Sequence, residues 1–126
     1  MTPKYSYTVG AALMWSQRQL GHLLQQNESN PTILNTATQI VPNNADRLVL
    51  VVMNVSASNV TVALNAGVTT TNGIIIVANT GALIVEVRDD FTLPSFAWWV
   101  ISAGASSVIY VLELIASVEL PGVPGT

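Results

Sequence analysis

The sequence predicts an all-β fold: an antiparallel sandwich or jelly-roll-like barrel of about seven strands, with an N-terminal helical or extended arm. Short runs of β-branched and aliphatic residues recur at spacings of roughly ten residues from position 32 to position 115. Asn, Asp, Gly and Ser, which favour turns, separate these runs. Half of the 126 residues are hydrophobic, and a chain of this length can bury one core.

Seven segments have strand character, and each has turn residues at its ends. In the second, RLVLVVMN, apolar residues are nearly continuous, which is typical of a strand buried on both faces. The third alternates, with Val60, Val62 and Leu64 on one face. Asn72-Gly73 then supplies the positive φ of a tight turn. The predicted strands are 32–40, 47–54, 59–65, 74–77, 82–88, 97–102 and 107–115.

The chain divides by composition into three parts. Residues 1–30 form the predicted arm, residues 31–117 a β-sandwich domain, and residues 118–126 a Pro/Gly-rich tail that cannot extend a sheet. Within the arm, residues 11–26 place apolar side chains on one stripe of a helix, which the sequence NESNP then ends. The arm residues expected to make contacts are Leu13, Trp15, Leu20 and Leu24.

Charged residues are scarce: they make up 9% of the chain, against about 25% in an ordinary soluble domain. Either Thr, Asn and Ser provide a weakly polar exterior, or copies and partners cover part of it. We expect the second. The four basic residues are scattered, so the sequence does not predict phosphate-mediated nucleic-acid binding. The chain has no cysteine, which excludes disulfides and thiolate chemistry.

Residues 91–112 carry no charge and are long enough to cross a membrane. However, Pro94 and the Gly-Ala-Ser-Ser turn at residues 104–107 interrupt the segment. Two strands joined by a turn explain it better than one helix, and we therefore expect no membrane span.

Groups that carry chemistry are few. His22 is the one imidazole, and it lies among Leu and Gln residues without a partner for acid–base work. Glu86, Asp89 and Asp90 form the one acidic cluster; it could hold calcium, but a solvated turn balanced by Arg88 is the simpler interpretation. No phosphate-binding glycine loop occurs. We therefore expect no enzyme, no cofactor and no metal.

Trp98 and Trp99 are adjacent in a predicted strand, so their side chains point to opposite faces. One is expected in the core and the other outside. An outward Trp could anchor a protein contact or stack on a sugar, and we favour the protein contact.

The order of segments from Arg47 to Leu114 resembles small virion proteins of tailed bacteriophages, of the head-decoration, cement and head-fibre type. The segments are RLVLVVMNVSASNVTVAL, the Thr-rich loop and strand TTTNGIII, ALIVEV before an acidic turn, and AWWVISAGASSVIYVLEL. The resemblance covers a little over half of the chain and depends on turn chemistry rather than on a catalytic signature. It implies a small β-protein, often trimeric, that binds the outer capsid surface.

Together these observations predict a structural virion protein, made in the host cytoplasm, that decorates or stabilises a capsid as a homo-oligomer, with a trimer favoured. Its expected partners are copies of itself and the major capsid protein or another virion protein. The alternative is a carbohydrate- or receptor-binding sandwich of a phage fibre. Contacts are expected at the four arm residues named above and at Trp98 and Trp99.

Overall fold

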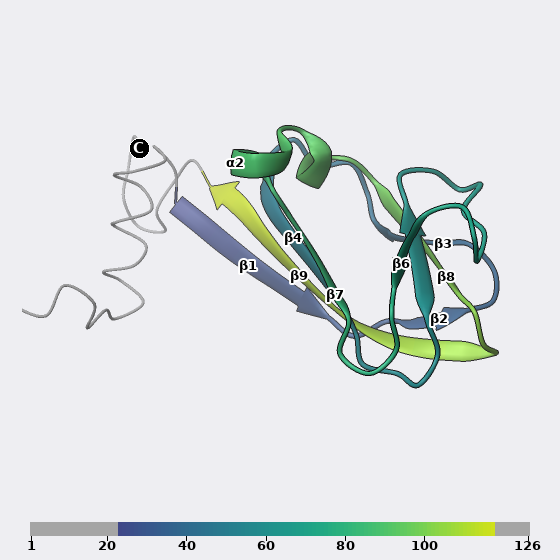
Figure 1. Ribbon diagram of the computed structural model, residues 1–126. Helices are drawn as coiled ribbons and strands as arrows, with labels where there is room; N and C mark the ends of the chain where they lie inside the picture. Colours follow the sequence, from purple (N-terminus) through teal and green to yellow (C-terminus); the bar gives the residue numbers. More distant parts are fainter. Residues whose placement is uncertain (1–22, 118–126) are drawn as a thin grey trace, which may run out of the picture.

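A computed structural model describes residues 23–117 of the chain as a two-layered β-sandwich (Figure 1). The five-stranded sheet has the order β1-β9-β4-β7, with β2 also paired to β9, and the four-stranded sheet has the order β3-β8-β5-β6. The strands are β1 (Leu23–Ser29), β2 (Thr32–Leu34), β3 (Thr38–Val41), β4 (Arg47–Asn54), β5 (Val60–Ala63), β6 (Ile74–Ile76), β7 (Ala82–Glu86), β8 (Trp98–Ser102) and β9 (Ser106–Ser117). A helical turn, α2 (Val87–Asp90), and a 3-10 turn, η1 (Leu93–Ser95), connect β7 to β8.

All strand pairs are antiparallel. Strands near the start of the chain pair with strands near its end, and strands closer to the middle pair with one another. The strands β1 and β2 pair with β9, β3 with β8, β4 with β7, and β5 with β6. The two antiparallel sheets confirm the predicted sandwich. The pairing order within it is that of a jelly roll, in which a long hairpin winds into two sheets.

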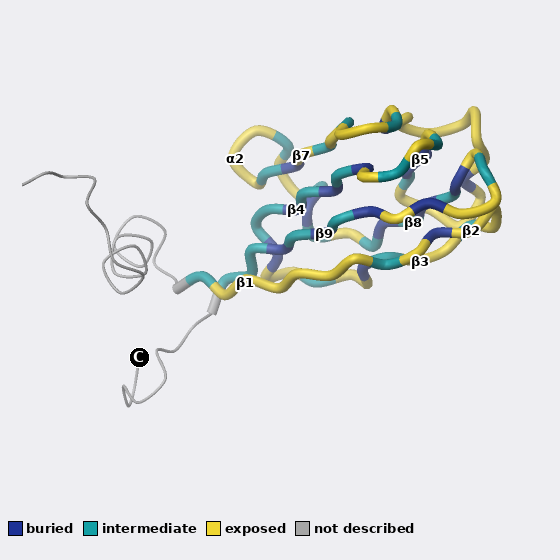
Figure 2. Tube along the Cα trace, turned by 90° about the horizontal axis from the view of Figure 1, so that it is seen from below, coloured by how far each residue is buried: buried dark blue, intermediate teal, exposed yellow. Residues whose placement is uncertain are grey.

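The core lies between the two sheets. Leu50 and Val52 of β4 and Val60 and Val62 of β5 belong to one buried cluster, and all four are 0% exposed. Alternate residues of each strand supply this layer, as the period of a strand requires. Figure 2 shows the resulting alternation of buried and half-buried positions along β4 and β9. The other members of the core are Ile33, Val41, Ile76, Val85, Trp98, Val100, Ile109 and Val111.

The structure has more strands than predicted. The segment 32–40 divides into β2 and β3, which lie in different sheets. The helix predicted for residues 11–26 is wrong at its described end, because residues 23–29 form β1 and pair with β9 from Leu23↔Ser117 to Ser29↔Val111. An isolated helix is marginal in water, whereas an antiparallel partner satisfies the backbone of the whole segment. Residues 23–29 therefore belong to the sandwich rather than to the arm.

Two details of the predicted strands also differ. The third strand ends at Ala63, which leaves Leu64 41% exposed rather than in line with Val60 and Val62. The strand β4 is buried on one face only: Leu50, Val52 and Asn54 are buried, but Val49, Val51 and Met53 on the other face are half-buried. That second face is apolar, and no second layer of sheet formed by residues 23–117 lies on it.

Candidate docking surface

The three expected contact residues that the structure describes, Leu24, Trp98 and Trp99, do not gather at one place. Leu13, Trp15 and Leu20 lie outside the described residues, as does His22. Leu24 is half-buried on β1. Trp98 is 2% exposed and belongs to the core, whereas Trp99 is half-buried on the outer side of the four-stranded sheet. The two tryptophans thus point to opposite faces.

The outer side of the five-stranded sheet carries a broad apolar area, which we call the apolar sheet face. Its rows follow from the register: Val51 pairs with Ile84 of β7 and with Leu112 of β9, and paired residues point to the same side. Ile84 is 56% exposed and Val108 is 40% exposed. The members are Val49, Val51, Met53, Ala82, Ile84, Val108, Tyr110, Leu112 and Leu114.

Charge is nearly absent from the apolar sheet face. By register, Glu28 of β1 shares the row of Leu112, and Glu86 of β7 shares the row of Val49. The hydroxyl of Tyr110 donates a hydrogen bond of 2.9 Å to Oε2 of Glu28. That hydrogen bond, with burial and the carboxylate charge, raises the pKa of Tyr110 above its ordinary 10.0. An antiparallel sheet usually presents polar residues on its solvated side, so this face has the composition of a covered surface.

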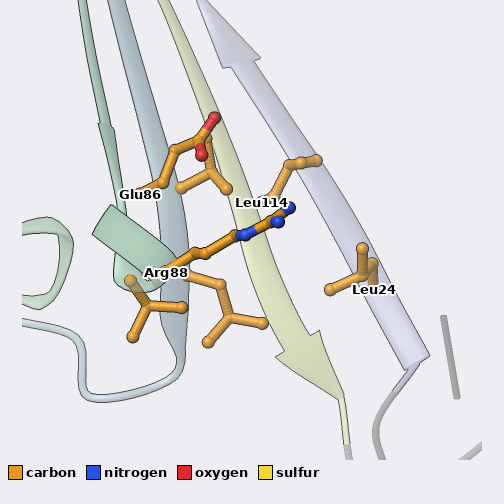
Figure 3. A pocket seen from close by; sticks show the side chains of 7 residues that line it. Leu24, Glu86, Arg88 and Leu114 are labelled. Carbon is orange, nitrogen blue, oxygen red and sulfur yellow. The ribbon is translucent and has the colours of Figure 1, made fainter. Parts of the chain in front are cut away.

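A pocket of about 210 Å³ lies at one end of the apolar sheet face, between β1, β4, β9 and the start of α2 (Figure 3). Its walls are Leu24, Leu48, Val49, Val87 and Leu114. Glu86 and Arg88 complete the lining. Figure 3 shows the Arg88 side chain reaching across the pocket from α2, while the Glu86 carboxylate points away from the Arg88 guanidinium. Leu24, chosen from the sequence as a contact residue, thus lies in the wall of a concave site.

A β-bulge in β4 shapes this pocket. The register with β9 shifts between Arg47, opposite Ile115, and Val49, opposite Leu114. A bulge sets two residues against one and bends the strand. Here Leu48 and Val49 both line the pocket, while Arg47 is turned inward and 1% exposed. A single apolar run from the sequence gives no sign of this bulge.

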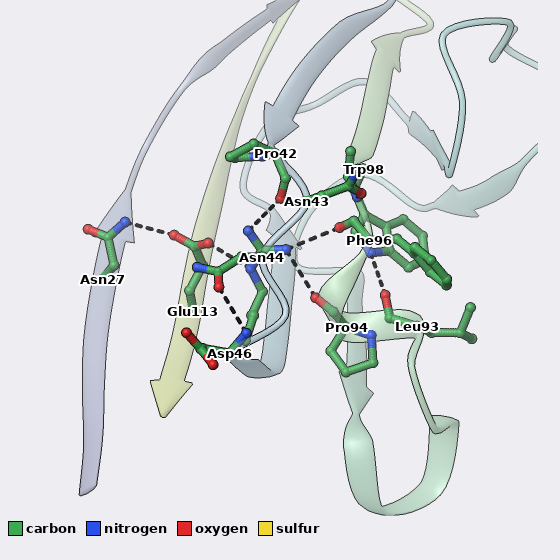
Figure 4. Close-up of polar contacts among 12 residues, drawn as sticks. Asn27, Pro42, Asn43, Asn44, Asp46, Leu93, Pro94, Phe96, Trp98 and Glu113 are labelled. Atoms are coloured by element: carbon green, nitrogen blue, oxygen red, sulfur yellow. Dashed lines mark hydrogen bonds and ion pairs between the residues drawn. The ribbon is translucent and has the colours of Figure 1, made fainter. Parts of the chain in front are cut away.

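Arg47 holds the bulge in place through a buried polar cluster (Figure 4). Its Nε donates to Glu113 at 2.7 Å, forming an ion pair. The two terminal nitrogens donate to the backbone carbonyls of Pro42, Pro94 and Phe96 at 2.8, 3.0 and 3.1 Å respectively. Asn27 of β1 donates to the second oxygen of Glu113 at 2.7 Å. The cluster ties β1, β4 and β9 to the loops before β4 and β8.

A second hollow, of about 290 Å³, lies at the end of the sandwich where Leu64 and Ile74 approach η1. Leu93 and Trp98 form part of its lining, and the Trp98 indole donates to the Leu93 carbonyl at 3.1 Å. The indole is therefore fixed with its polar atom satisfied. Phe91 and Phe96, on either side of η1, are 78% and 43% exposed.

Within residues 23–117, no group of three or more His, Cys, Asp or Glu side chains is arranged to hold a metal ion. In the acidic cluster, the Asp90 carboxylate accepts a hydrogen bond of 2.9 Å from the Glu86 backbone N–H. In the same part of the chain, no helix is long and apolar enough to span a membrane. Residues 91–112 form η1, β8, a turn and part of β9.

No protein-family model matches the chain, and no curated protein matches it in sequence. Among solved structures, the fold is similar to a chain described under "Bacillus endospore appendages form a novel family of disulfide-linked pili". The TM-score is 0.49 and the identity is 11%, over 77% of this chain and 88% of that chain.

Proposed function

We propose that this protein is a structural virion component, which binds a capsid shell as a homo-oligomer and decorates or stabilises it. The observation that carries the proposal is the apolar sheet face. It joins β4, β7 and β9 in one surface, and Glu28 and Glu86 are the charged residues in its rows. Burying such a surface stabilises an assembly by about 25 cal/mol per Å² of apolar area before the costs of association.

Two further features support the proposal. The jelly roll is a fold used by viral capsid proteins and lectin domains, which is an argument by analogy. The polar clusters that occupy the interior, around Arg47 and around Asn54, are saturated with protein hydrogen bonds and leave no buried side-chain polar atom unpaired among the described residues. These polar groups therefore stabilise the sandwich and have no unpaired atom to offer a substrate.

Self-association is tested by sedimentation velocity of the full chain with matched variants. Ile84→Lys places a charge on the apolar sheet face, and Ile75→Lys places one at a similarly exposed position, 51% against 56%, on β6 of the other sheet. We expect the wild type to sediment as a trimer, Ile84→Lys to dissociate and Ile75→Lys to remain associated. A wild-type monomer, or equal behaviour of the two variants, contradicts a role for this face.

The virion assignment needs a test of its own. Gold-labelled antibodies against the purified chain should decorate the capsid surface of particles from the source culture in electron micrographs. Label confined to the tips of fibres would favour the receptor-binding alternative, in which Trp99 is the outward member of the Trp98–Trp99 pair. A glycan array with wild type and Trp99→Ala then decides that alternative: sugar binding lost in the variant would replace the decoration role.

A further inference from the structure

The pocket on the apolar sheet face has the size of a site for one side chain. Its volume of about 210 Å³ is below the ~300–1,000 Å³ of pockets that hold small-molecule ligands. Of the seven lining residues within 23–117, five are Leu or Val. Protein interfaces concentrate their binding energy in such places, where a large apolar side chain enters a pocket and loses its water.

The mouth of the pocket carries a cation that has no partner among residues 23–117. Arg47 and Arg88 are the two Lys or Arg residues within 23–117. Arg47 makes four hydrogen bonds inside the protein. Arg88 is exposed, and no hydrogen bond or ion pair joins it to another described residue, while its side chain reaches over the apolar floor (Figure 3).

A guanidinium at the edge of an apolar pocket favours a particular kind of occupant. An exposed ion pair contributes little in water. When a docked side chain excludes water from the mouth, the same pair interacts in a lower dielectric and selects one sign of charge. The side chain of Glu86 lies at another part of the rim and points away, so the anion is preferred on the Arg88 side.

We propose that this pocket binds a segment of a partner polypeptide in which a Leu- or Phe-sized side chain fills the cavity and an adjacent acidic residue pairs with Arg88. The inference rests on the docking role proposed for the apolar sheet face, and it names the partner's chemistry. A polypeptide fits better than a free amphiphile, because the pocket admits one side chain and the next row of the sheet beyond Val49 is also apolar, with half-buried Val51 and exposed Ile84.

The test uses the full chain with ¹³C-labelled leucine methyl groups and three capped tetrapeptides: Ser-Leu-Asp-Ser, Ser-Leu-Asn-Ser and Ser-Leu-Lys-Ser. We expect peptide-dependent NMR shifts at Leu24, Leu48 and Leu114, with the Asp peptide bound roughly three- to tenfold more tightly than the Lys peptide. Arg88→Glu should reverse that order. Because Arg88 is exposed and unpaired within the described chain, the variant should retain the wild-type circular dichroism spectrum.

Three results would overturn the inference: no shift at these methyl groups, equal affinity for the three peptides, or an order that Arg88→Glu leaves unchanged. Shifts produced by hexanoate but by none of the peptides would assign the pocket to a small amphiphile instead. These NMR measurements require neither the virion nor an oligomer of the protein. A negative result together with capsid labelling would leave the proposed function standing, whereas peptide binding without labelling would reject the virion role alone.

Discussion

Arg47 and Glu113 form a buried ion pair, with 2.7 Å between Nε and Oε1 and side chains 0% and 9% exposed. The pair joins β4 to β9, and Asn27 of β1 donates to the same carboxylate, so that side-chain polar contacts link these three strands. Removing two charges from water is costly, and the cost is offset only when the remaining hydrogen bonds are also made. Here Asn27 and three backbone carbonyls make them.

Replacing Arg47 by Met should therefore lower the free energy of unfolding by about 3–5 kcal/mol, because Glu113 would keep a buried charge without its counter-ion. Urea denaturation followed by tryptophan fluorescence measures the loss. Arg88→Met is the matched control, and we expect it to stay within about 0.5 kcal/mol of wild type, since Arg88 is exposed. The double variant Arg47→Met/Glu113→Leu should be less destabilised than Arg47→Met; equal losses in the two would contradict this account.

Asn54 is the second buried polar position whose loss should be costly. It is 0% exposed, and its side chain joins the β4–β5 turn to the end of β6: Nδ2 donates to Ser58 O at 2.7 Å and Ile76 O at 3.1 Å, and Oδ1 accepts from the N–H and hydroxyl of Ser56. Asn54→Leu would leave these groups unpaired, at about 1–3 kcal/mol for each one that water cannot reach. Asn35→Leu is the control, because Asn35 is exposed and no side-chain hydrogen bond joins it to another described residue. A similar loss of Tm in both variants would show that the buried network contributes little.

The fold class could be predicted from the sequence because the spacing of apolar residues within each short segment indicates a strand without knowledge of its partners. The segment 47–54 was placed with correct bounds, since Pro42 to Asp46 and Ser56 to Ser58 mark both ends. The orientation of Trp98 and Trp99 also followed from the strand period alone.

The rest depended on contacts distant in sequence. Residues 23–26 have a helical pattern in the sequence. In the fold they pair instead with β9, which lies about 90 positions later in the chain and places Ser117 opposite Leu23. Arg47 looks like the polar start of a strand, and Glu113 like an isolated acid in an apolar one; only the fold brings them together. The pocket combines Leu24, Leu48 and Leu114 from three strands with a bulge, and no motif in the sequence links them.

Tyr110 provides a test of charge on the apolar sheet face. Its pKa is raised, first by the hydrogen bond to Glu28 and then by desolvation and the carboxylate charge. The neutral phenol is thus favoured in the folded state, so its contribution to stability is present below pH 10.0, the ordinary value, and is lost as the pH rises through the higher folded value. Titration of ¹³C-labelled tyrosine rings should show one pKa above the others, identified by its absence in Tyr110→Phe. Glu28→Ala should lower it; an unchanged pKa would mean that the pair does not form in solution.

The two parts of residues 1–29 should respond differently to truncation. Deleting residues 1–22 keeps all nine described strands, whereas deleting residues 1–29 removes β1, uncovers the edge of β9 from Val111 to Ser117, and takes Asn27 from Glu113 and Glu28 from Tyr110. We expect the longer deletion to cost at least about 2 kcal/mol more than the shorter one, or roughly 8–16 °C in Tm, and to aggregate through the open edge. Calorimetry and light scattering of the two proteins measure both effects.

Sedimentation of the shorter deletion, alongside Trp15→Ala, separately tests the sequence-based expectation that the arm mediates assembly. If the shorter deletion remains fully associated, the apolar sheet face is sufficient for self-association and Trp15 is not its anchor.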